Sequence, residues 1–156
     1  MNEVKKIHDL LEETYEGRPW HGPSLKKILS GITAEVAATR GIATAHTIWE
    51  IALHVRAWME IVRLRLGGRV VSVGRKRDWP DAGETTEESW KKTLEDLDAT
   101  FRQLMDAVSS LRPGGLERKI PRKNYTAYKM LHGVIDHNVY HSAQISLLKK
   151  EIASRV

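Results

Sequence analysis

The stretch AHTIWEIALHVRAWMEIVRLRL, residues 45–66, decides the fold. It contains neither Gly nor Pro, and its apolar residues occupy most sides of a helix with 3.6 residues per turn. A helix that is apolar nearly all round must be enclosed by other elements, because its side chains would otherwise face water. The Gly67-Gly68 pair ends the pattern. The segment therefore predicts a long helix inside a helical core.

Three other segments have helical periodicity and clear ends. They cover residues 3–16, from Thr85 or Thr86 to about 111, and about 125–153. Short helical turns are expected near residues 25–29 and 33–38. Residues 70–83 are rich in turn formers and are expected to be a long connection across the bundle, extended near Val70–Val73. The prediction is all-α: a four-helix bundle with a long crossover connection.

Composition sets the class of protein. A chain of 156 residues with 41% hydrophobic residues predicts one folded domain over residues 1–156. Cys is absent, which excludes disulfides and thiolate ligands. The first residues lack the apolar core of a signal peptide, and no apolar run reaches the ~18–20 residues of a membrane span. A cytoplasmic protein without membrane partners is expected.

The net charge of +5 raises the question of a nucleic-acid partner. The positive residues are scattered over separate segments, most of them beside acidic residues or turns. We therefore expect a solvated surface and no nucleic-acid binding.

The histidines indicate a site. His137 and His141 have i, i+4 spacing, which places two imidazoles one turn apart on one helix face. His54 lies within the most apolar helix, at the edge of the stripe that contains Ile51 and Trp58. Burying three imidazoles in one core is costly unless they are paired or coordinated, and a shared divalent metal removes that cost. The predicted metal ligands are His54, His137 and His141.

Three neutral imidazoles leave at least one coordination position open, as in catalytic metal sites. The residue after His137 is Asn138, where the zincin motif has a general-base Glu, so a metalloprotease is not expected. Gln144 and Glu50, each one turn from a candidate ligand, are candidates to orient imidazoles or substrate; an exposed surface carboxylate is the alternative for Glu50. Imidazole ligands suit zinc, nickel, copper and iron alike.

Three phrases of the sequence resemble the DinB-like superfamily, especially its YfiT-like members. They are Trp20-His21-Gly22-Pro23-Ser24-Leu25, His46-Thr47-Ile48-Trp49-Glu50-Ile51 continuing to His54, and His137-Asn138-Val139-Tyr140-His141-Ser142-Ala143-Gln144-Ile145. The likeness covers nearly the whole chain, and the last phrase is its most specific part.

The resemblance implies an up-down-down-up bundle, often dimeric, with a metal on His54, His137 and His141. It implies zinc or nickel, with iron or manganese as alternatives. Trp20, His21 and Tyr140 are expected to line the substrate pocket, although simple packing of the turn is equally expected for Trp20 and His21. The superfamily contains proteins classed as metal-dependent hydrolases, bacillithiol transferases and mycothiol-dependent isomerases.

The reaction stays open at this stage. A metal-dependent hydrolase acting on a small molecule is the first hypothesis, and transfer from a low-molecular-weight thiol is the second. A non-catalytic metal-binding stress-response module and a purely structural histidine cluster are the remaining alternatives. A homodimer is expected because Trp49, Leu53 and Leu64 are predicted to lie on helix faces that need cover.

Overall fold

The computed structural model describes residues 2–155 and contains helices and no strands within that range. Four long helices form the bundle: α1 (Glu3–Glu16), α4 (Ile48–Leu66), α6 (Glu87–Ser109) and α7 (Ala127–Ala153). Three short helices lie in the connections: α2 (Leu25–Leu29), α3 (Ala34–Ala38) and α5 (Arg75–Asp78). The all-α prediction is confirmed.

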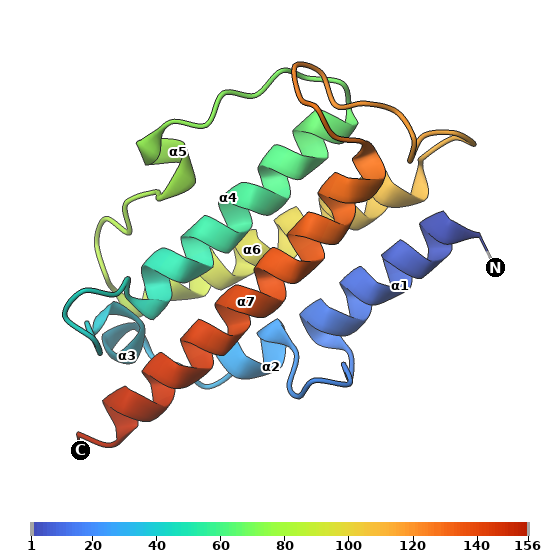
Figure 1. The fold of residues 1–156 in the computed structure, drawn as a ribbon. Coiled ribbons are helices and arrows are strands. Elements are labelled where there is room, and N and C mark those ends of the chain that lie inside the picture. Colours follow the sequence, from blue (N-terminus) through green and yellow to red (C-terminus); the bar gives the residue numbers. More distant parts are fainter. Residues whose placement is uncertain (1, 156) are drawn as a thin grey trace.

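The long helices run up-down-down-up, and the long connection from α4 to α6 crosses the bundle so that these two helices run in the same direction (Figure 1). α4 packs against both α6 and α7, and α1 contacts the same two helices. α4 therefore lies beside α7, the helix that contains His137 and His141. No helix among residues 2–155 combines the length and the apolar character needed to cross a bilayer.

Side-chain caps fix where the helices begin. The hydroxyl of Thr47 accepts from the Glu50 amide while the Glu50 carboxylate accepts from the Thr47 amide, a complete capping box at the start of α4. Thr86 caps α6, which settles the choice between Thr85 and Thr86, and Thr126 caps α7. Gly67 is the C-cap of α4, and Gly68 follows at φ 85°, a left-handed conformation that glycine adopts without strain.

The structure contradicts the prediction that Trp49 and Leu53 lie on a helix face that a second copy of the chain would cover. Trp49 is 1% exposed, and its indole N–H donates to the Thr93 hydroxyl of α6 across 3.1 Å. Leu53 is also buried, and Leu64 is half-buried. Trp49 and Leu53 are covered within the chain because α4 is enclosed by α6, α7 and the connections, so neither offers a face for dimerisation.

Candidate metal centre

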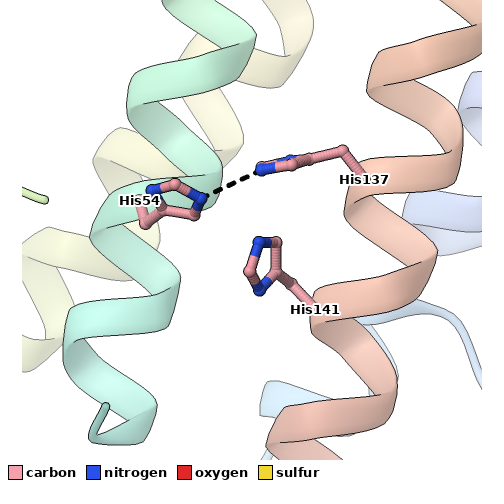
Figure 2. A group of neighbouring side chains, drawn as sticks. All are labelled: His54, His137 and His141. Atoms are coloured by element: carbon pink, nitrogen blue, oxygen red, sulfur yellow. Dashed lines mark hydrogen bonds between the residues drawn. The ribbon is translucent and has the colours of Figure 1, made fainter. Parts of the chain in front are cut away.

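The three predicted ligands meet between α4 and α7. His54 and His141 are buried and His137 is partly buried, and Figure 2 shows their rings facing one another across the two helices. The Nε2 atoms of His54 and His137 are 3.0 Å apart. Each of the three rings has a nitrogen within 4.8 Å of a nitrogen of the other two. Among residues 2–155 this is the buried group of side chains that could hold a metal ion; the other such group, His8, Asp9 and Glu12, is not buried.

The spacing fits one ion. Zinc–imidazole bonds of about 2.1 Å in a tetrahedron place ligand nitrogens roughly 3.4 Å apart. The His54–His137 separation of 3.0 Å is slightly shorter than this value, and the ligand nitrogens of all three rings lie within 4.8 Å of one another. The donor set is nitrogen only, which suits zinc and the neighbouring transition metals.

Hydrogen bonds orient two of the rings. Nδ1 of His54 lies 2.6 Å from the backbone carbonyl oxygen of Asp78, and a carbonyl can only accept, so Nδ1–H donates. Nδ1 of His141 lies 2.7 Å from Oε1 of Gln144 and donates in the same way. In the neutral rings both Nε2 atoms then carry lone pairs. Oxygen acceptors behind metal-binding imidazoles are the usual arrangement in metalloproteins.

His137 has an unpaired ring nitrogen that a bound ion would accommodate. Because Nε2 of His54 carries a lone pair, His137 must donate its own Nε2–H to it, which leaves Nδ1 of His137 as a bare acceptor. That Nδ1 is buried without a hydrogen-bond partner, and so is Oδ1 of the adjacent Asn138. Unpaired buried polar atoms cost about 1–3 kcal/mol each. With a metal ion held at Nε2, the proton of His137 would lie on Nδ1, and one of the two unpaired acceptors would become a donor.

Burial keeps the three rings neutral. It lowers the pKa of His54 and of His141, and it lowers the pKa of His137 to about 4, where the neighbouring His141 and His54 act in the same direction. The neutral form is the one that coordinates a metal, so the rings require no proton loss at neutral pH.

The crossover connection closes one side of the group. The Trp79 indole stacks on the His54 ring with centroids 3.8 Å apart and an angle of 8°, and it stacks on the His46 ring as well. Oδ1 of Asp78 accepts from the indole N–H of Trp58 and lies 3.3 Å from Nδ1 of His54. Sequence reasoning missed Asp78, Trp79 and His46. A Trp-Pro pair inside a polar connection was the available signal.

A cavity of about 650 Å³ opens onto the three histidines. Tyr140 and Gln144, two of the side chains named from the sequence, line it. Glu50 does not appear in its wall: the carboxylate accepts from the Thr47 amide and contacts Nδ1 of His46 at 3.1 Å. Glu50 thus reaches His54 only through the stack of His46 and Trp79.

Trp20 and His21 lie elsewhere. Both are exposed, Trp20 at 99%, in the connection between α1 and α2, and neither lines the cavity at the histidines. The structure therefore brings Tyr140 and Gln144 to the candidate site and leaves Trp20 and His21 outside it.

The chain has also been compared with known proteins. No curated protein and no solved structure is significantly similar to it. The family model of the DinB superfamily matches residues 20–145, a range that includes all three histidines. An all-helical bundle whose long helices bring His54, His137 and His141 together agrees with that match, and the chain belongs to the DinB superfamily.

Proposed function

We propose that this protein is a metal-dependent hydrolase of small molecules that holds one zinc or nickel ion on His54, His137 and His141. The observation that supports it is a buried group of three neutral imidazoles, two of them oriented by oxygen acceptors, beside a cavity of substrate size. When bound, the ion supplies a Lewis acid that favours deprotonation of a water or thiol at neutral pH.

The chain's own residues have distinct roles in this proposal. The Asp78 carbonyl and Gln144 hold the rings of His54 and His141 with Nε2 toward the common point. Trp79 covers the face of His54 and excludes water from it. The exposed Tyr140 lines the cavity and offers a hydroxyl and an aromatic face to the substrate.

A thiol transfer is the second candidate, and two observations favour it. Asp78 is the carboxylate among the described residues that line the cavity, and its Oδ1 already accepts from Trp58, so only one carboxylate oxygen of the cavity wall is left to activate a water. The chain contains no Cys, so the sulfur must come from a small-molecule thiol, for which a cavity of about 650 Å³ has room beside an electrophile.

Elemental analysis of protein purified without a nickel column tests the metal. We expect about one ion per chain in the wild type and in His132→Ala, and none in His137→Ala. His132 is the matched control because it lies on α7 but outside the cavity at the three histidines. An equal metal content in the wild type and in both variants would contradict the proposed metal site.

Activity is then measured on the metal-loaded protein with ester and amide panels, and with electrophiles plus low-molecular-weight thiols. Hydrolysis that disappears in His137→Ala supports the first candidate, and thiol-dependent turnover supports the second. Metal binding without turnover in either assay would contradict the proposed enzymatic activity and would support a non-catalytic metal-binding module.

A further inference from the structure

Arg65 is a buried cation without a matching anion. Its side chain lies near the end of α4 and is 4% exposed. Within residues 2–155 its hydrogen-bond partners are neutral: the Tyr125 hydroxyl and the Val71 carbonyl, each at 3.1 Å. A buried guanidinium without a carboxylate is costly, and a guanidinium has five N–H donors, of which these bonds use two.

A second cavity of about 270 Å³ lies beside this guanidinium. Two cations, Arg65 and Lys129, line this cavity. Within residues 2–155 no acidic residue lines it. Its other walls are mostly apolar, formed by Trp58, Val62, Met130 and Val134. An apolar cavity of about 150 Å³ can bind benzene, so this one has room for a short acyl or phenylalkyl group.

The two cavities share Trp58 and His137 as walls. The guanidinium carbon of Arg65 lies 5.8 Å from the centroid of the Trp58 ring, and the His137 ring lies 5.8 Å from Trp58 as well. Trp58 therefore lies near both the cation and one of the candidate metal ligands. Arg65 and His137 both line the second cavity, so a molecule whose anionic end lies at Arg65 would extend its apolar body along a wall that includes His137.

We propose that this second cavity binds a small carboxylate with an apolar body, its carboxylate paired with Arg65. Arg–carboxylate pairs form two parallel hydrogen bonds, which matches the donors that Arg65 has left. Lys129 stands at the same cavity and adds a second, exposed positive charge. The binding site itself is independent of a metal; its role in anchoring a substrate for the three histidines rests on the proposed function.

Calorimetric titration of the full-length, metal-free protein with hexanoate and with hexanamide tests the proposal. The two probes have the same body and differ in charge, so this comparison requires no variant. We expect hexanoate to bind about tenfold or more tightly than hexanamide. Equal affinity for the two probes, or no binding of hexanoate at roughly 10 mM, would overturn the proposal.

Substitutions then identify which cation binds the carboxylate of hexanoate. Arg65→Gln should remove the preference for hexanoate, Arg65→Lys should keep part of it, and Lys129→Gln should weaken binding by only about threefold because its charge is exposed. Arg63→Gln is the matched control, since Arg63 lies on the same helix and pairs with Glu60. If Arg65→Gln unfolds, the Arg65→Lys variant carries the test, and an unchanged hexanoate preference in Arg65→Lys would contradict the assignment.

One further variant separates this site from the metal. His141 does not line the second cavity, so His141→Ala should bind hexanoate as the wild type does, even though it cannot hold the metal. Loss of binding in His141→Ala would mean that the carboxylate is held by residual metal at the histidines, and the proposed site would be withdrawn while the proposed function would remain.

Discussion

The Trp79 indole lies flat on the His54 imidazole, 3.8 Å from it between ring centroids, although the two residues belong to different elements. His54 comes from the buried helix α4, and Trp79 follows the short helix α5 in the crossover connection. The same connection supplies the Asp78 carbonyl to Nδ1 of His54. The orientation of one candidate ligand therefore depends on a segment more than twenty residues away in sequence.

Trp79→Leu should weaken metal binding and lower stability. An aromatic pair contributes about 0.5–1.5 kcal/mol beyond its buried area, so we expect a loss of about 1–2 kcal/mol in the free energy of unfolding. Urea denaturation followed by circular dichroism measures it. Trp20→Leu is the matched control, because Trp20 is 99% exposed and its replacement should change stability by less than about 0.5 kcal/mol. Equal losses in the two variants would contradict a specific role for the stack.

Gln144→Ala should lower metal affinity by roughly 10- to 100-fold while the helix content stays unchanged. The variant leaves Nδ1–H of His141 without its acceptor, and removal of such acceptors typically has an effect of this size. Competition with a chromophoric chelator gives the dissociation constant. Gln103→Ala on the exposed face of α6 makes the same substitution away from the site and should leave the affinity unchanged.

Removal of the ion should lower the melting temperature. A ligand present at about a thousand times its dissociation constant stabilises the folded state by about 4 kcal/mol, which for a chain of this length corresponds to roughly 10 °C. Differential scanning calorimetry with and without a chelator measures the change. In His137→Ala the chelator should not change the melting temperature. If the chelator also leaves the melting temperature of the wild type unchanged, the histidine group is purely structural.

The metal-free protein should lose stability as the pH falls from about 6.5 to about 4. Burial lowers the folded-state pKa of His54, His137 and His141 below that of an unfolded histidine, so the unfolded chain binds more protons in this window. Stability therefore rises with pH and levels off above about 6.5. For His137 alone the change is about 2 kcal/mol once its partial exposure is allowed for. Urea midpoints at several pH values test this, and His137→Gln should show a shallower slope.

The sequence predicted the long helices because their apolar residues repeat at helical spacing and because Gly, Pro and hydroxyl residues mark the ends. Thr47 and Thr126 begin their helices within a few residues of the predicted starts. The helix α5 was missed because a single turn of four residues has too few positions to reveal a period.

The three histidines could be found from the sequence because two share one helix face and the third lies in a helix that must be buried. Their supporting partners could not all be found that way. Gln144 is local to His141, one turn along α7, whereas Asp78 and Trp79 reach His54 only through the path of the crossover. Local periodicity contains no information on that path. Arg65 was overlooked for a related reason, since its burial depends on residues 71 and 125.

The crossover connection also bears on how the chain tolerates change in length. Surface connections usually accept inserted or deleted residues with little effect. Here the connection after α4 orients the His54 imidazole through the Asp78 carbonyl and the Trp79 ring. The length of the connection between Gly67 and Asp78 therefore has to match the distance from the end of α4 back to His54. A single residue added between Gly68 and Gly74 would displace both groups, and a loop that looks dispensable would determine ligand geometry.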